Sequence, residues 1–347
     1  MTVNERPGIY SSYEVSSALA GSGIGGAVGI AAVVSGNADT AYTISSYADA
    51  VSKFGTNSQI SELIRILFLN GAPSIVAAPV QTAATVQDYE AAFAVLQGDE
   101  TVRVLVCDSA NAAVHAAMLS SILSAPENSK FRIGVVETSG TVQGVTTAAE
   151  ALNSERIVMA APAALNAAGV HNPGAAAAAL AGAIAAQSDP AVPLNGAHLL
   201  GLYGLGATLS DADINTLVRG GVTPLEFSGG RAFAIRGVTT RTKTGGAPDT
   251  TWRELTTTLI LDDVITTVKN SLRSRFARAK NTAQTRGAIR TQVMIELENK
   301  QNREIIDSYT NVSVAPAPSD PTVCEVSFDF AVSHGLNQIF LNAHITV

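Results

Sequence analysis

The chain has 347 residues, of which 46% are hydrophobic and 15% are charged, and its formal net charge is -7. This length supports about two domains with a sizeable core, and the acidic balance argues against a general nucleic-acid binder, which needs a basic surface to neutralise phosphates. The charged fraction is below the roughly 25% that is usual for soluble proteins, so we expect partners to cover much of the surface.

The cysteines and the apolar segments limit the location of the chain. Cys107 and Cys324 are too few for a disulfide framework and offer no metal-ligand spacing, so two reduced, buried thiols are expected. The first ten residues are polar and contain Pro7 and Gly8, unlike a signal peptide. Apolar stretches such as residues 157–170 are interrupted and too short to span a bilayer. These features predict a cytoplasmic chain without a membrane segment.

The N-terminal region begins with an expected extended arm over residues 1–20, because Ile9, Tyr13 and Val15 fall on one face at a period of two. Apolar spacing then predicts a strand, two helices and a second strand, over residues 27–34, 45–54, 61–69 and 74–80. Ser61 is the expected N-cap of the second helix, and Asn70-Gly71 is expected to end it.

The central region alternates between predicted strands and helices. The strands lie over residues 102–107, 131–136 and 156–160, and the helices over residues 110–123 and 145–152. This alternation is typical of a mostly parallel, doubly wound sheet. An alanine-rich helix follows up to Gln187, with Asn172 as its expected N-cap and Pro173 at its first position, and a further strand is expected over residues 231–239.

The composition changes at residues 242–251, where Gly245, Gly246 and Pro248 indicate a loop or domain junction. We therefore expect an α/β domain over residues 21–245 and a smaller α+β domain over residues 246–335. The smaller domain and the C-terminus contain predicted helices over 259–279 and 285–299, and predicted strands over 311–315, 323–332 and 336–347.

The last predicted strand, residues 336–347, is the expected C-terminal arm. Ile339, Leu341, Ile345 and Val347 face one way, and polar residues face the other. Such a segment can be donated to a neighbouring subunit, or it can be an ordinary edge strand of its own sheet.

Motifs that would indicate catalysis are weak. The run from Gly21 to Gly26 formally matches a dinucleotide fingerprint, but no strand precedes it, so a flexible hinge is expected. The histidines are scattered, and no Gly-x-Ser-x-Gly elbow is present. Asp262 and Asp263 are expected to precede a helix body and to complement its dipole. We therefore predict no catalytic, cofactor-binding or metal-binding residue, and no enzyme, with an α/β oxidoreductase or hydrolase as the alternative.

One charge pattern stands out between Lys269 and Arg290, where basic residues occur without any acidic residue among them. A solvated helix face usually mixes the two signs. The pattern therefore favours contact with an acidic partner surface, and a plain solvated face is the alternative.

Several segments resemble the contractile phage tail sheath family, and the resemblance extends over nearly the whole chain. These segments are Arg6 to Tyr10, Phe68 to Ala72, Glu155 to Pro162, Ala181 to Pro190, Gly220 to Pro224 and Arg236 to Thr240. The resemblance implies a central α/β domain with a subtilisin-like fold but no catalysis, in agreement with the missing triad. It also implies an inner domain near the C-terminus that contacts a tail tube, and terminal arms that add strands to neighbouring subunits.

On this basis the chain is expected to be a sheath subunit that polymerises helically and contracts, with another assembly protein, such as a tube or surface-layer subunit, as a further alternative. The expected partners are further copies of the chain, the tail tube protein, and the baseplate and tail terminator proteins, without nucleic acid or a cofactor. Assembly is expected in the host cytoplasm, before the subunit becomes part of a virion or of a released phage-tail-like particle. The candidate tube contacts are Lys269, Arg273, Arg275, Arg278 and Lys280, and the candidate inter-subunit strand residues are Ile9, Tyr10, Tyr13, Val15, Ile339, Leu341, Ile345 and Val347.

Overall fold

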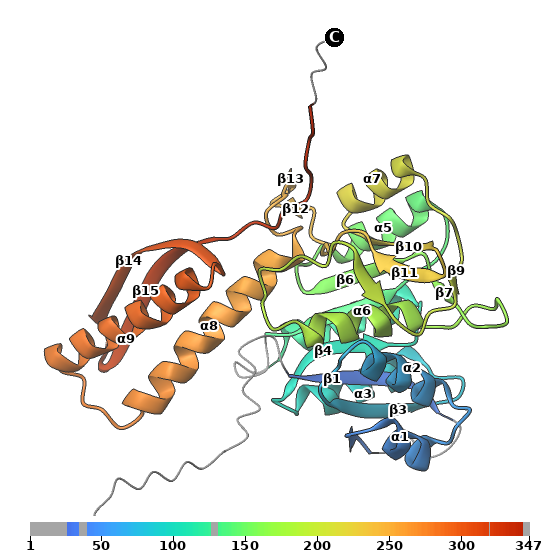
Figure 1. Cartoon of the computed structure of the whole chain (residues 1–347). Helices are drawn as coiled ribbons and strands as arrows, with labels where there is room; N and C mark the ends of the chain where they lie inside the picture. The colour runs from blue at the N-terminus through green and yellow to red at the C-terminus, as the bar shows by residue number, and fades with distance from the viewer. Residues whose placement is uncertain (1–25, 35–39, 126–130, 319, 343–347) are drawn as a thin grey trace, which may run out of the picture.

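The computed structural model describes residues 26–34, 40–125, 131–318 and 320–342, which form a large α/β domain and a smaller α+β part (Figure 1). The main sheet contains β1 (Ala27–Val34), β2 (Tyr42–Ile44), β3 (Ile75–Gln81), β4 (Val102–Cys107), β5 (Ile133–Glu137), β6 (Ile157–Ala161), β8 (Ala197–Leu199), β10 (Thr223–Ser228) and β11 (Arg231–Ala234). Two short pairs accompany it: β7 (Ala164–Leu165) with β9 (Gly204–Leu205), and β12 (Lys243–Thr244) with β13 (Ala247–Pro248).

The main sheet has nine strands in the order β2-β3-β1-β4-β5-β6-β10-β11-β8. From β3 to β10 the neighbouring strands run parallel, whereas β2, β11 and β8 pair antiparallel at the two edges. The parallel strands are apolar and buried on both faces, as expected where helices cover a sheet on both sides. The predicted α/β class with a mostly parallel sheet is therefore confirmed.

Helices cover both faces of this sheet (Figure 1). One layer contains α1 (Tyr47–Phe54), α2 (Gln59–Leu69) and α6 (Ala175–Ala186), and the other contains α3 (Val86–Gln97), α4 (Ala112–Leu123), α5 (Val142–Leu152) and α7 (Asp211–Arg219). Each layer forms its own hydrophobic cluster with the side chains of the sheet. The core therefore consists of two apolar layers of side chains, one on each face of the main β-sheet.

The alanine-rich helix α6 packs closely on the sheet and on its neighbour α2. A Cβ atom added to Gly182 would lie 2.8 Å from the carbonyl oxygen of Leu67 and 2.8 Å from Cβ of Asn70. Asn70 ends α2, donates its amide to the carbonyls of Ile66 and Leu200, and accepts from the backbone of Leu200. Small side chains on α6 therefore allow a helix contact that larger ones would separate.

The smaller part consists of α8 (Leu255–Phe276), α9 (Ala283–Asn302), β14 (Ile306–Ala317) and β15 (Asp320–Val332). The two helices and the β14–β15 hairpin share a third hydrophobic cluster, in which Val264 and Leu297 are fully buried and against which Phe328 packs. After β15 the chain runs back to the α/β domain and then turns away from it near β12 and β13 (Figure 1). The predicted smaller α+β unit is thus present in the fold.

Several predicted boundaries were wrong, and two of them concern the residue that precedes a helix. Ser58 caps α2 in place of Ser61, whose hydroxyl instead donates to the carbonyl of Gly55. Gly174, with φ of 76°, precedes α6 in place of Asn172. Helices α3 and α7 and strand β10 were not predicted, and the strand expected over 231–239 ends at Ala234.

The termini differ most from the expectation. Residues 336–342 have no regular secondary structure in the chain itself, so the expected strand is absent over that range. Ala343 to Val347, the arm over residues 1–20 and the run from Gly21 to Gly25 lie outside the described residues. Cys107 is buried as expected, whereas Cys324 is half-buried. Within the described ranges, every helix is too short or too polar to span a membrane.

The close contact between α6 and α2 generates a prediction. We expect Gly182→Ala to lower the free energy of unfolding by about 1–3 kcal/mol, because the new methyl group meets a helix backbone that cannot move away freely. The matched control is Gly287→Ala on exposed α9, where nothing lies within 4 Å of the added Cβ. The control should raise stability by about 0.5–1 kcal/mol through helix propensity. Urea unfolding of the unpolymerised subunit measures both changes, and equal effects at the two positions would contradict the packing argument.

Candidate assembly site

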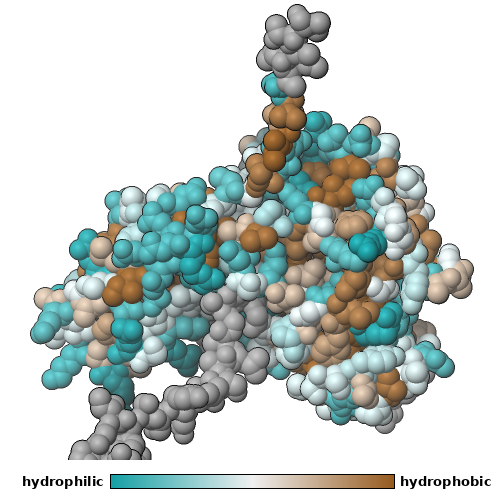
Figure 2. Space-filling model, in the orientation of Figure 1, coloured by the Kyte–Doolittle hydropathy of each residue, from teal (hydrophilic) through white to brown (hydrophobic). Residues whose placement is uncertain are grey.

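The C-terminal arm, residues 336–347, is described up to residue 342, and residues 333–335 form its base. The described part of the arm exposes large apolar side chains. Leu336, Ile339, Phe340 and Leu341 are 71%, 78%, 85% and 90% exposed. In the space-filling view this hydrophobic segment stands away from the body (Figure 2). Isolated exposed apolar side chains are common, but consecutive ones on an extended segment favour burial by a partner.

The arm is not paired with its own sheet over its described part. From His334 to Asn342 the backbone makes no hydrogen bond to any other described residue, the last one before it being the bond from Ser333 to the carbonyl of Ile305. The predicted inter-subunit residues Ile339 and Leu341 both lie in this free segment. Phe340, which is equally exposed, was not among the predicted inter-subunit residues, because it falls on the face that the alternation assigned to polar residues. Its large aromatic side chain could have marked it as a further candidate.

The β14–β15 hairpin offers unused strand edges. The pairing runs from Ile306 with Val332 to Ala317 with Asp320, and within the described residues each of the two strands pairs only with the other. The face turned away from the helices is polar, with a hydrogen bond of 2.8 Å between the hydroxyls of Ser313 and Ser327. A two-stranded sheet with two free edges is marginal by itself and can accept further strands.

The predicted basic residues divide into two groups. Arg275, Arg278 and Lys280 are exposed at the end of α8 and in the turn that follows it. Lys269 lies closer to the α/β domain, in a small cavity that Arg103 and the exposed Arg273 also line. The outermost charges therefore form a basic tip, defined as residues 273–280, at the free end of the α8–α9 pair.

Two later basic residues of the same run serve the fold. Arg286 donates to the side chain of Asn281 at 3.0 Å, and Arg290 donates to the carbonyl of Val312 at 2.9 Å. These bonds fix α9 to its preceding turn and to β14. The one-signed pattern in the sequence thus combines residues with a structural role and residues that face outward.

The two adjacent aspartates of α8 hold this helix to both of its neighbours. Asp262 pairs with Arg156 of the α/β domain at 2.5 Å, and Asp263 pairs with Lys300 of α9 at 2.5 Å. The expectation that these residues precede the helix body was wrong, because α8 already begins at Leu255. Burial raises the pKa of Asp262, and Arg156 acts in the opposite direction.

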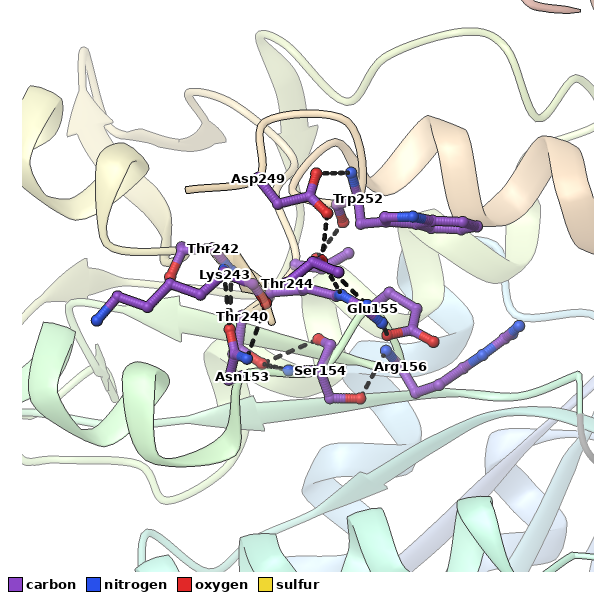
Figure 3. A network of polar contacts seen from close by, with 12 residues as sticks. Asn153, Ser154, Glu155, Arg156, Thr240, Thr242, Lys243, Thr244, Asp249 and Trp252 are labelled. Atoms are coloured by element: carbon purple, nitrogen blue, oxygen red, sulfur yellow. Dashed lines mark hydrogen bonds and ion pairs between the residues drawn. The ribbon is translucent and has the colours of Figure 1, made fainter. Parts of the chain in front are cut away.

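A polar network reinforces the junction between the two parts (Figure 3). Asn153 ends α5 in the left-handed conformation, and its side-chain oxygen accepts from the backbone of Thr242 and Lys243. Thr240 exchanges hydrogen bonds with the backbone of Ser154. Because these bonds connect segments far apart in the sequence, they fix the path of the chain into α8.

The carboxyl edge of the parallel sheet, where α/β enzymes place their ligands, contains acidic groups with partners inside the fold. The hydroxyl of Tyr89 and the backbone of Val33 both donate to Asp108, at 2.5 and 2.8 Å. Glu137 accepts from the backbone of Ala176 at 2.7 Å and pairs with His171 at 2.8 Å. Burial raises the pKa of Asp108. These groups position the helices and β1, and in the described ranges no cluster of three metal-ligating side chains occurs.

Comparison with known proteins gives consistent matches. The family described as phage tail sheath protein central domain matches residues 82–240, and the phage tail sheath C-terminal domain matches residues 247–346. The tail sheath protein of Bacillus phage SP01 is 28% identical over 258 residues, which cover 70% of this chain and 43% of that protein. The chain thus spans less than half the length of that relative.

Solved structures share the fold at low sequence identity. The sheath tail protein from Desulfitobacterium hafniense has a TM-score of 0.70 at 13% identity, covering 94% of this chain and 100% of that chain. The contracted helical sheath of the anti-feeding prophage has a TM-score of 0.71 at 15% identity, with 99% of each chain covered. The contracted PVC sheath, from an extracellular contractile injection system, has a TM-score of 0.71 at 18% identity, covering 100% and 99%.

The buried ion pair at the junction generates a prediction. We expect Arg156→Ala to cost about 3–5 kcal/mol of unfolding free energy, because it leaves Asp262 buried without its cation. The matched control is Lys243→Ala, which removes an exposed pair with Glu150 and should cost less than about 1 kcal/mol. Equal losses in the two variants, measured by denaturant unfolding, would contradict a special role for the junction pair.

The same variant should show a characteristic pH dependence. Loss of Arg156 raises the pKa of Asp262 further above its ordinary value of 3.8, so the folded state binds more protons than the unfolded state. The variant therefore loses stability as pH rises from about 4 through the raised folded pKa, and its deficit relative to the parent protein is smaller in acid. A deficit that does not change across that interval would contradict this assignment.

Proposed function

Because the chain belongs to the contractile phage tail sheath family, which two matched domains cover in succession, we propose that it polymerises helically around a tail tube and contracts to drive the tube through a cell envelope. Members of this family are structural sheath proteins rather than enzymes. The similar chains of the anti-feeding prophage and of PVC come from contracted sheaths, which supports the same role here.

The observation that carries this proposal is that one chain combines an exposed apolar arm with a hairpin that has free edges. An extended segment can add a strand to a neighbour's sheet, where main-chain hydrogen bonds supply affinity and alternate side chains fill pockets. The open edges of β14 and β15 are the acceptors that we propose. Ile339 and Leu341 are then buried on one side, and Phe340 on the other.

Such a contact propagates, because the donor and the acceptor are different surfaces of the same chain. Heterologous contacts of this kind build rings or helical filaments rather than closed dimers. A segment of the arm without backbone hydrogen bonds to the body separates the subunit from the strand that it donates. Two copies can therefore change their relative orientation while the donated strand keeps them connected. Contraction is then a change of lattice packing with subunit connectivity preserved.

The remaining assignments follow the same proposal. Residues 21–245 form the sheath domain, residues 246–335 form the inner domain, and residues 1–20 and 336–347 serve as arms. Within the inner domain the basic tip contacts the tube, and Lys269 joins this contact at its margin. The baseplate and tail terminator proteins bind the ends of the polymer. The subunit assembles in the host cytoplasm and remains in the virion or in a released particle.

Removal of the arm tests the strand-donation mechanism. We expect a chain truncated after Leu336 to stay folded and to melt cooperatively but not to polymerise, because the described part of the arm contributes exposed side chains rather than core contacts. Electron microscopy and sedimentation check polymer formation, and calorimetry checks folding. Normal polymers from the truncated chain, or a chain that unfolds and aggregates, would overturn strand donation by this segment.

Reversal of the basic tip tests the tube contact. The triple change Arg273→Glu, Arg275→Glu and Arg278→Glu should weaken co-sedimentation with preassembled tubes and leave the melting temperature nearly unchanged, because exposed charges contribute little to stability. The control, Arg219→Glu with Arg231→Glu, reverses exposed charges on the α/β domain. Unchanged tube binding of the triple variant at moderate salt would place the tip away from the tube.

A further inference from the structure

We propose that the loop between α6 and β8, residues 187–196, clamps the base of the C-terminal arm and sets the direction in which the arm leaves the subunit. The proposal rests on the proposed function, because direction matters only if the arm is donated to a neighbour. Within this loop Pro193 and Asn195 are the positioning residues, and Gly335 and Asn337 are their contacts on the arm.

The first contact is a hydrogen bond. The side-chain amide of Asn195 donates to the side-chain oxygen of Asn337 at 2.7 Å. The other side-chain atom of Asn195, Oδ1, is buried and has no partner among the described residues. A buried polar atom without a partner costs stability, so this asparagine is poorly explained by the stability of the loop. The role that we propose for Asn195 is to present its amide as a hydrogen-bond donor to the arm.

The second contact is steric. A Cβ atom added to Gly335 would lie 2.9 Å from Cγ of Pro193 and 3.1 Å from its Cβ. The backbone of the arm therefore lies directly on the proline ring, at a distance that only glycine allows. Because a proline ring moves little, it gives the arm a firm support on this side.

The loop itself is held rigidly. Leu194 is only 5% exposed and belongs to the core of the α/β domain, whereas Ala191 packs against the cluster of the smaller part. Gln187 donates to the carbonyl of Val192 at 2.8 Å, and the side chain of Asp189 accepts from the backbone of Ala191 at 2.9 Å. The loop thus contacts both parts of the subunit and the arm at once.

These contacts end where the exposed segment begins. Beyond Asn337, no hydrogen bond joins the described residues of the arm to the body, and Ile339 to Leu341 are almost fully exposed. A clamp at the base and a free donor segment beyond it reduce the orientations that the arm samples before it meets a neighbour. Such preorganisation lowers the entropic cost of association without any new contact.

Two substitutions on either side of the clamp test the proposal. We expect Asn195→Ala to slow polymerisation by roughly three- to tenfold, the range that corresponds to one hydrogen bond, without changing the melting temperature. Val192→Ala is the control, since this exposed side chain of the same loop takes no part in the two contacts with the arm and lies outside the donated segment.

The steric contact has its own test. Gly335→Ala should slow polymerisation because the new methyl group collides with Pro193, and adding Pro193→Ala should restore part of the rate by removing the nearest ring atom. If the melting temperature of either single variant falls together with its polymerisation rate, the loop has a merely structural role and the proposal is overturned.

A distance measurement separates this proposal from strand donation itself. Spin labels on Leu341→Cys and Gln143→Cys, in a chain carrying Cys324→Ser, report the direction of the arm in unpolymerised subunits. We expect a defined distance distribution that broadens in Asn195→Ala and Gly335→Ala but not in Val192→Ala. If the distribution stays the same in all variants, the clamp is wrong, whether or not the arm is donated. If truncation after Leu336 leaves polymerisation normal while the distribution still broadens, strand donation is wrong and the clamp stands.

Discussion

In the proposed assembly, main-chain hydrogen bonding between an arm and the sheet edge of a neighbouring subunit is the interaction on which the rest of the architecture depends. In the single subunit, β14 and β15 each pair only with the other among the described residues, and the arm carries Ile339 and Leu341 into solvent. Both features are liabilities for a monomer, because free edges and exposed apolar segments promote association. In the proposed polymer the free edges and the apolar arm satisfy one another. On this proposal the subunit is complete only within its lattice.

The α/β domain supplies the rigidity that such a lattice needs. Helix α6 packs closely on α2 through Gly182, and the parallel strands are buried on both faces. At the junction, Asp262 and Asp263 fix α8 to the α/β domain and to α9. Because each carboxylate is buried with its cation, neither pair can separate without a large cost. In the proposed contraction, the contacts between subunits therefore change while each subunit keeps its shape.

Charge is distributed according to the same division of roles. Ion pairs of α8 with its neighbours are largely buried, whereas Arg275, Arg278 and Lys280 stay exposed at the tip of the α8–α9 pair. Positive charge also suits this end of α8, because it lies at the negative end of the helix dipole. An acidic partner surface can thus bind the tip without competing with pairs that stabilise the subunit.

The sequence alone determined the α/β class, most strands of the parallel sheet and the two late helices, because apolar periodicity is a local property of the chain. It also singled out Ile339 and Leu341 by their alternation. Only the tertiary structure decided that Ser58 rather than Ser61 caps α2, that Asp262 and Asp263 lie inside α8 as ion pairs, and that Asn195 reaches Asn337. In each of these cases the folded chain decides which group the side chain contacts. Asp262 pairs with Arg156 and Asn195 with Asn337, and in both pairs the two residues are more than a hundred positions apart in the sequence. A pattern confined to one segment carries no information about a partner that the fold brings to it.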